Sequence, residues 1–310
     1  YLGLDIIELV TVNAFNKSIT VKCGSNGEIA AFDVASIVGF DANEGEKLNP
    51  SIASTFGIGV IVKKLIEKGH KKIYIGLGGS ITNDLGLGMM KALGMKFYIN
   101  NEQVHPYGYN MGNITKVSMD DLLISDVKII CLSDVKSPLF GPTGAALMFA
   151  KQKGATDEMV VKLEEDAKKV VEVIKDVTIE CSSESGSGAA GGLGFAFKTF
   201  LNAEMKSGID EIISISKVSD NIEEDAVIIT GEGKFDDQSL EGKVISGIVN
   251  MAKSKKARVL VVAGYSEIDT LEGIEKIFSC TDKIVGIDEL KRTCVANLKS
   301  TTKQVYEYLK

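Results

Sequence analysis

Four stretches of the sequence place glycines beside hydroxyl, carboxylate or lysine side chains, each where an apolar strand is expected to end. They are Gly78-Gly79-Ser80 with Asn83 and Asp84, Ser133-Asp134 with the residues up to 146, the run 186–194, and Gly231-Glu232-Gly233-Lys234 with Asp236. Ligands of open α/β sheets bind beyond the carboxyl ends of the strands. Glycine there lets backbone N–H groups reach an anion, and acidic side chains suit Mg²⁺ carried with a phosphate. The sequence therefore predicts a site for a phosphate-bearing ligand.

Each stretch also has a simpler explanation. Gly86 and Gly88 lie early in an expected helix, where each costs ~1 kcal/mol relative to alanine, and close helix packing explains them as well as a ligand does. The run GSGAAG at 186–191 matches the dinucleotide-binding pattern, but polar residues separate it from the preceding strand, which the fingerprint should follow directly. The spacing of a P-loop occurs nowhere in the chain. The prediction of a phosphate-ligand site therefore rests on the occurrence of four such strand ends in one chain, which chance packing explains poorly.

The elements that must position these residues alternate along the chain. Residues 6–34 read as short antiparallel strands, 57–69 as a helix that stops at Gly69, and 71–77 as a buried strand. A helix is expected from an N-cap at Thr82 or Asn83 to Gly94. The chain continues with a strand at 127–135, an amphipathic helix at 157–176, a strand at 177–181 and a helix that ends near 205 and contains Glu204.

After a polar connector at 214–225 the pattern becomes more regular. Strands are expected at 225–231, at 258–264 and around 284–287, with helices at 242–256 and at the C-terminus. Strands that alternate with helices indicate parallel sheets joined by right-handed crossovers. A length of 310 residues fits about two domains. We expect an α/β protein with an α/β domain over residues 1–215, which carries the glycine-rich loops, and a second domain over 216–310.

Composition narrows the class of protein. The 35 basic and 42 acidic residues give a net charge of −7, which argues against nucleic acid as the main partner. No apolar run approaches the ~18 residues of a membrane helix, so no membrane partner is expected. The five scattered cysteines form no CxxC pair and predict reduced thiols of a cytosolic protein, without a zinc site. His70 and His105 lie far apart in the sequence and are expected in exposed loops.

Five collinear stretches resemble the bacterial glycerate kinases, the group distinct from the sugar-kinase superfamilies. The resemblance covers the chain from about residue 8 to 310, and its signature stretches are 49–59, 76–94, 134–156, 186–210 and 227–243. It implies ATP-dependent phosphorylation of D-glycerate with Mg²⁺, at the 2-hydroxyl. It also implies two α/β domains, one of them Rossmann-like and including the C-terminal part, the other with a mixed sheet, and an active site in the cleft between them.

The resemblance and the chemistry of phosphoryl transfer together suggest roles. Such transfer asks the protein to align donor and acceptor and to neutralise charge. Asp134 and Asp236 are candidates for metal ligation or for accepting the hydroxyl proton, Glu232 is a second metal candidate, and Lys243 is a further catalytic candidate. The chain has only two arginines, so lysine must supply positive charge. The expected substrate and phosphate contacts are Gly78, Gly79, Ser80, Asn83, Asp84, Lys153, Gly186, Gly188, Gly191, Gly231, Gly233 and Lys234.

Two other functions stay open at this point. A nicotinamide-dependent dehydrogenase would use Gly186–Gly191, and a non-catalytic protein would bind glycerate or a nucleotide without turnover. Family members begin with a strand and a Pro-Asp-Ser-Phe-Lys-Gly stretch that would precede Tyr1, so the resemblance predicts an incomplete chain that lacks the first strand of the Rossmann-like sheet. A homodimer is an open alternative to a monomer.

Overall fold

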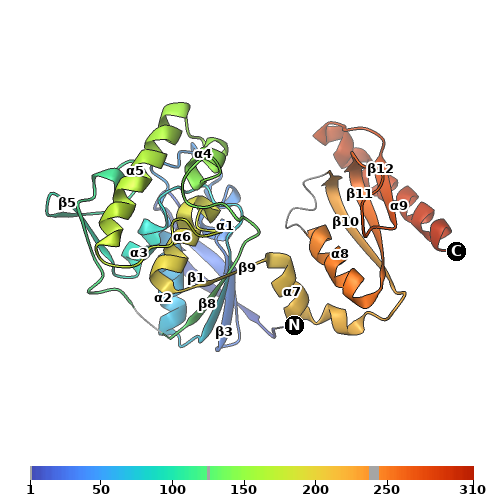
Figure 1. Cartoon of the computed structure of the whole chain (residues 1–310), viewed down its shortest axis with the longest axis horizontal. Coiled ribbons are helices and arrows are strands. Elements are labelled where there is room, and N and C mark those ends of the chain that lie inside the picture. The colour runs from blue at the N-terminus through green and yellow to red at the C-terminus, as the bar shows by residue number, and fades with distance from the viewer. Residues whose placement is uncertain (1, 124–125, 237–243) are drawn as a thin grey trace. The chain divides into compact units, whose positions relative to one another are not determined.

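The computed structural model describes residues 2–123, 126–236 and 244–310. The chain divides into two compact units, Tyr1–Gly208 and Ile209–Lys310. Figure 1 shows that each unit has its own sheet and its own helices. The division falls at the start of helix α7 (Gly208–Ser216), which contains the boundary expected at residue 215.

A six-stranded mixed sheet forms the centre of unit 1, with the order β1-β2-β3-β4-β8-β9. Strands β1 and β3 each pair antiparallel with β2, which lies between them, and β3, β4, β8 and β9 run parallel. The bounds are β1 (Asp5–Val12), β2 (Ser18–Ser25), β3 (Ile29–Asp33), β4 (Lys72–Gly76), β8 (Lys128–Leu132) and β9 (Glu204–Lys206). The expected mixed sheet of this part of the chain is confirmed.

The hairpin of β1 and β2 follows from local sequence. Asn13 Oδ1 accepts hydrogen bonds from the N–H groups of Phe15 and Lys17, both at 3.0 Å, and Asn16 adopts a φ of 61°. Asparagine favours such turns because its side chain mimics a backbone acceptor and tolerates the left-handed region. The turn fixes the register, so that Leu9 and Thr11 of β1 face the core.

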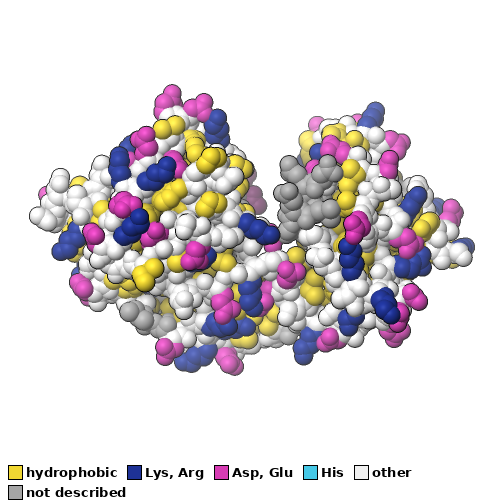
Figure 2. Space-filling model, in the orientation of Figure 1, with side chains coloured by type: hydrophobic (Ala, Val, Ile, Leu, Met, Phe, Trp, Pro, Cys, Tyr) yellow, Lys and Arg dark blue, Asp and Glu magenta, His cyan; other side chains and the backbone are white. Residues whose placement is uncertain are grey.

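Helices pack on this sheet through amphipathic faces. Helix α2 (Phe56–Glu67) packs against β1 and α3 (Leu87–Ala92), and α6 (Ala189–Leu201) packs against β8 and β9. Helix α5 (Asp157–Lys175) begins where Thr156 Oγ1 accepts a bond from Met159 N, and buries Val160, Leu163 and Val170. Further elements of unit 1 are α1 (Ala35–Val38), α4 (Ala145–Phe149), three short 3-10 helices, η1 (Asp41–Asn43), η2 (Met111–Asn113) and η3 (Lys151–Lys153), and a small antiparallel sheet of β5 (Lys96–Ile99), β6 (Glu102–Val104) and β7 (Lys116–Ser118). Figure 2 shows both signs of charge interspersed over the visible face of the molecule.

Unit 2 holds a parallel sheet of three described strands, β10 (Val227–Phe235), β11 (Arg258–Ser266) and β12 (Lys276–Thr281). Helix α8 (Val244–Lys255) packs on one face with Ile245 and Val249, and α9 (Ile287–Leu309) on the other with Val305. Figure 1 shows these two helices on opposite sides of the strands. Among the described residues, no helix is long and apolar enough to cross a bilayer.

Several expected elements differ in the structure. Residues 177–181 form no strand, and Ile179 is 91% exposed. Glu204 opens strand β9 instead of lying in a helix. The last strand is Lys276–Thr281 rather than 284–287, since the parallel register with β11 selects the earlier segment.

Two further expectations are corrected. Helix α3 begins at Leu87, after Gly86 at a φ of 74°, and neither Thr82 nor Asn83 caps it. His70 is buried, at 4% exposure, where its ring bonds Ser25 Oγ at 2.7 Å and Leu65 O at 2.9 Å. Gly69 and Gly94 do follow the ends of α2 and α3, both with positive φ.

Candidate functional site

The carboxyl ends of three neighbouring parallel strands bring polar residues to one edge of the unit 1 sheet. Asp33 ends β3, Gly78 and Gly79 follow β4, and Asp134 follows β8. The register pairs Asp33 with Gly76 and Gly76 with Leu132, so these chain segments leave the sheet side by side. This edge has the geometry at which open α/β sheets bind ligands.

The turn after β4 presents bare backbone. Gly78 and Gly79 are exposed, and neither N–H donates a hydrogen bond within the described residues. A Cβ added at Gly78 would meet no atom within 4 Å, so packing does not require glycine there. Ser80 is buried instead, and its Oγ lies 2.8 Å from Thr82 Oγ1. The two glycine amides are therefore available to an oxyanion, whereas the Ser80 hydroxyl is engaged inside the turn.

A cavity of about 470 Å³ opens beside this turn. Its lining includes Gly79, Asp33, Ser36, Phe40 and Asp41. Asp33 Oδ1 accepts a hydrogen bond from Ser36 N at 2.7 Å, which holds the carboxylate at the rim. Sequence reasoning missed Asp33 and Asp41. A signal for Asp33 was present, since an acidic residue ends an apolar strand and precedes a short helix.

Asp134 is exposed at the same edge, and its Oδ1 accepts a hydrogen bond from Gly208 N at 3.1 Å. This is the one hydrogen bond of the carboxylate to a described residue, and it orients the exposed side chain. The position suits either a metal-bound water or a substrate hydroxyl.

Asp84 and Asn83 are buried, in contrast to the ligand contacts expected of them. Asp84 is 0% exposed, and its carboxylate accepts bonds from Thr55 N, Thr55 Oγ1, Gly86 N and Gly88 N at 2.8 to 3.3 Å. Burial raises the pKa of Asp84, and the four donors oppose that rise. Its carboxylate holds α2 and the start of α3 together rather than facing a ligand.

Lys153 is also buried, at 3% exposure, and its Nζ donates a hydrogen bond to Thr82 O at 2.7 Å. Burial lowers the pKa of Lys153 to about 7, while the negative charge of Asp84 acts in the opposite direction. The ammonium group therefore fastens the backbone of the glycine-rich turn from inside. It does not reach the exposed edge where a phosphate contact was expected.

The run 186–194 joins the other two stretches of unit 1 by close backbone packing. Leu85 N donates to Gly191 O at 3.2 Å, and Gly188 N donates to Ser137 O at 2.9 Å. A Cβ at Gly191 would lie 2.0 Å from Thr82 O, and one at Gly188 would lie 2.3 Å from a carbonyl oxygen. Gly186 is buried as well, with a φ of 85°.

The glycines of this run are thus required by packing, and the run does not follow a strand as a dinucleotide fingerprint should. Glu204, which the sequence placed inside a helix, forms a surface ion pair with Lys128 at 2.7 Å. The same argument explains Gly88, whose Cβ would lie 2.3 Å from Ser54 Oγ.

The fourth stretch lies in unit 2, inside strand β10 and just after it. Lys234 Nζ lies 2.9 Å from Glu267 and 3.4 Å from Asp236, and the hydrogen bond to Glu267 is the main cause that raises the pKa of Lys234. A Cβ at Gly233 would meet nothing within 4 Å. Gly231 lies on the same strand. Lys243 lies outside the described residues.

Two carboxylates of this stretch fit a magnesium ion that arrives with a nucleotide. The described residues hold no group of three or more His, Cys, Asp or Glu placed for a metal ion. Kinase sites bind Mg²⁺ through one or two carboxylates together with substrate phosphates, so no such group is needed. Glu232 Oε2 is buried and has no hydrogen-bond partner within the described residues. A carboxylate oxygen without a hydrogen-bond partner in the described part of the chain, four residues before Asp236, has the chemistry of such a ligand.

Comparison with known proteins assigns the family. The model of the glycerate kinase family matches residues 1–310. The chain is 34% identical to the glycerate 2-kinase of Escherichia coli (strain K12) over 288 residues, which cover 90% of this chain and 76% of that protein. It is 30% identical to the glycerate kinase of Bacillus subtilis (strain 168) over 315 residues, which cover 98% and 82% of the two chains.

The fold agrees with the sequence comparison. A crystal structure of a Salmonella typhimurium LT2 protein, assigned as glycerate kinase 2, superposes with a TM-score of 0.83 at 27% identity and covers 99% of this chain and 83% of that one. Sequence and structure point to the same group, and the chain belongs to the glycerate kinase family.

Proposed function

We propose that this chain transfers the γ-phosphoryl group of ATP to the 2-hydroxyl of D-glycerate in a reaction that requires Mg²⁺. Family membership supports the glycerate kinase activity, and the name of the Escherichia coli relative supports the 2-position. The observation that carries the proposal for this chain is the pair of exposed amides of Gly78 and Gly79, which donate no hydrogen bond within the described residues, at the sheet edge that also carries the carboxylates of Asp33 and Asp134.

Unit 1 supplies the groups that suit the acceptor. The amides of Gly78 and Gly79 bind the glycerate carboxylate, because two adjacent N–H donors form an anion-binding concavity. Asp134 accepts the proton of the 2-hydroxyl, since an exposed carboxylate within hydrogen-bond reach is a suitable general base. Asp33 and Asp41 line the adjoining cavity and can accept hydrogen bonds from the remaining hydroxyl.

Unit 2 supplies the groups that suit the donor. The ammonium of Lys234 contacts the polyphosphate, and Lys243 is proposed for the same task. Glu232 and Asp236 would hold Mg²⁺, which neutralises charge on the phosphate oxygens when bound. In phosphoryl transfer this charge neutralisation and the alignment of donor and acceptor supply most of the catalysis.

The buried residues of the glycine-rich stretches act as supports. Lys153 Nζ donates a hydrogen bond to Thr82 O, and the Asp84 carboxylate accepts one from Gly86 N just before α3. Gly191 allows the run 186–194 to pack closely on the backbone of Thr82 and Asn83. Their effect on activity is therefore indirect, through the position of the Gly78-Gly79 amides. Location in the cytoplasm and homodimer formation stay predictions; the five free cysteines accord with a reducing compartment.

Initial rates of ADP formation test the proposal. We expect turnover with D-glycerate, less with glycerol, which lacks the carboxylate, and none with 3-hydroxypropionate, which lacks the 2-hydroxyl. Asp134→Asn should lower kcat at least ~10-fold. The matched control is Asp176→Asn, an exposed acid at the end of α5, which should leave kcat unchanged. Equal rates for the two variants, or turnover of 3-hydroxypropionate, would contradict the assignment.

A further inference from the structure

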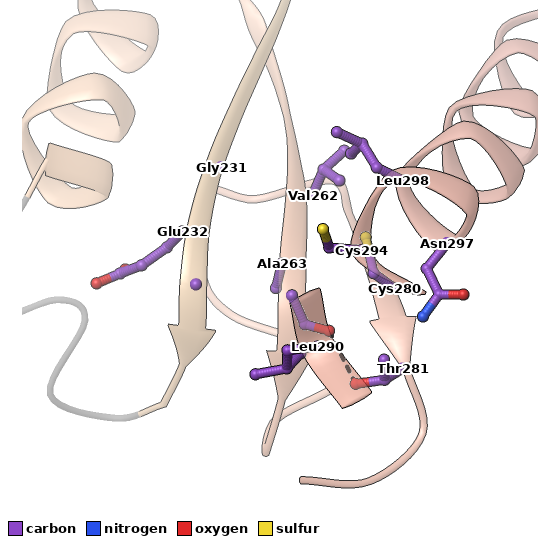
Figure 3. A pocket seen from close by; sticks show the side chains of 12 residues that line it. Gly231, Glu232, Val262, Ala263, Cys280, Thr281, Leu290, Cys294, Asn297 and Leu298 are labelled. Atoms are coloured by element: carbon purple, nitrogen blue, oxygen red, sulfur yellow. Dashed lines mark hydrogen bonds between the residues drawn. The ribbon is translucent and has the colours of Figure 1, made fainter. Parts of the chain in front are cut away.

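Unit 2 contains a cavity of about 450 Å³ between its sheet and helix α9. The sheet side of its lining includes Gly231 and Gly233 of β10, and Gly264 of β11. The α9 side is formed by Leu290, Cys294, Asn297 and Leu298, as Figure 3 shows. The cavity lies toward the carboxyl ends of three parallel strands, where ligands of open α/β sheets bind, and its volume falls in the range of small-molecule sites.

The cavity is a largely uncharged slot. Glu232 is the one ionisable carboxylate among its lining residues, and Figure 3 shows this side chain directed away from the cavity. The wall on β10 is bare backbone at Gly233, where a Cβ would meet nothing within 4 Å. The opposite wall is aliphatic, from Leu290 and Leu298. A slot with one backbone wall and one aliphatic wall suits a flat heterocycle, whose faces are apolar.

One polar side chain distinguishes which heterocycle fits. The Asn297 amide lines the cavity and makes no side-chain hydrogen bond within the described residues. An asparagine amide can donate through its nitrogen to N7 of adenine and accept through its oxygen from the N6 amino group. Thr281 differs, because its Oγ1 already donates to Gly264 O at 3.0 Å.

The same strand leads from the cavity to the groups proposed for the phosphates. Gly233 lines the cavity, Lys234 follows it, and Asp236 comes three residues after Gly233. Three residues of a strand span about 10 Å, which a ribose and a phosphate chain can cover. We propose that this cavity receives the adenine base of ATP, with the base between the β10 backbone and α9 and the phosphates at the carboxyl end of β10, where Asp236 follows the strand. This inference rests on the proposed kinase function.

Cys294 provides a test in the unaltered full-length chain. This cysteine is free, exposed and part of the lining. Its alkylation by iodoacetamide is followed by mass spectrometry of the peptide that contains it. ADP at ten times its dissociation constant should slow alkylation about tenfold, because only about one protein in eleven is then unoccupied. Adenosine at the same multiple of its own dissociation constant should protect equally.

The controls separate the base from the phosphates. Tripolyphosphate and D-glycerate should leave the alkylation rate unchanged. Protection by tripolyphosphate without protection by adenosine would overturn the proposal, since it would place phosphate in the cavity. An unchanged rate at saturating ADP would overturn it as well.

A pair of glycine variants gives a second, independent readout. Gly233→Val places a side chain in the slot, and we expect at least a tenfold rise in KM for ATP with an unchanged KM for D-glycerate. The matched control is Gly286→Val at the start of α9. A Cβ at Gly286 also meets nothing within 4 Å, and Gly286 is not one of the residues that line the cavity. An active Gly233→Val enzyme with an unchanged KM for ATP would refute the adenine site and leave the kinase function intact. Protection of Cys294 by ADP without turnover of D-glycerate would refute the kinase function and leave the nucleotide site intact.

Discussion

Lys153 makes the stability of unit 1 depend on pH in a direction that the structure determines. The residue is 3% exposed, and within the described residues its Nζ donates one hydrogen bond, to Thr82 O. Burial lowers the pKa of Lys153 to about 7 in the folded chain, from the ordinary value of 10.5 that applies after unfolding. Between these two values the unfolded chain binds more protons than the folded chain, so the free energy of unfolding rises with pH.

The magnitude follows from the two pKa values. One group contributes at most ~1.4 kcal/mol per pH unit, and between pH 7 and pH 9 the gain should be about 2 kcal/mol. Below pH 7 both states are protonated, and this dependence vanishes. In Lys153→Met no such gain exists, whatever the variant's stability at pH 7.

Urea denaturation at pH 7 and pH 9, followed by circular dichroism, measures the effect. The quantity of interest is the difference between wild type and Lys153→Met, because other groups that titrate in this range cancel in it. Lys63→Met, on an exposed face of α2, is the matched control and should follow the wild type. If the free energy of unfolding changed equally with pH in wild type and Lys153→Met, the lowered pKa assigned to the buried Lys153 would be refuted.

Three further outcomes follow from the site and its supports. Asp134→Ala and Asp236→Ala should each lower ATP turnover with D-glycerate at least ~10-fold in a steady-state assay, and a smaller loss in both would remove them from the reaction. Gly191→Ala should lower the free energy of unfolding by about 2 kcal/mol, because its Cβ would lie 2.0 Å from a carbonyl oxygen. Gly78→Ala should change the free energy of unfolding by less than about 0.5 kcal/mol, because its Cβ meets no atom within 4 Å, and should raise KM for D-glycerate. Thr156→Ala removes the N-cap of α5 and should cost about 1 kcal/mol in urea denaturation, with kcat unaffected.

Elements with a strong local signal were predictable from the sequence. The hairpin of β1 and β2, the amphipathic α5 and the alternation of unit 2 each depend on residues close in the chain. Strand β10 shows the limit of such signals. Gly231 and Gly233 read as a turn because glycine weakens strands, yet parallel pairing with β11 continues the strand to Phe235.

Of the four glycine-rich stretches expected to share one site, three pack against one another in unit 1, and the fourth lies in unit 2. The ligand contacts assigned to them stay predictions, and Gly78 and Gly79 are exposed. Asp84 and Lys153 were misjudged because charged residues usually lie at the surface, and only tertiary contacts reveal that Thr55 and Thr82 satisfy them inside the core. Asp33 was missed because a single acidic residue at a strand end carries no pattern of its own.

Phosphorus NMR of the reaction mixture tests the central claim most directly. The full chain is incubated with ATP, Mg²⁺ and D-glycerate, and the product resonance is recorded with proton coupling. Transfer to the 2-hydroxyl predicts ADP and one new phosphomonoester in equal amounts, split into a doublet by the single proton on the carbon that carries it. A triplet would place the phosphate on the 3-hydroxyl, and ADP with inorganic phosphate but no phosphomonoester would contradict the assignment of this chain as a glycerate kinase.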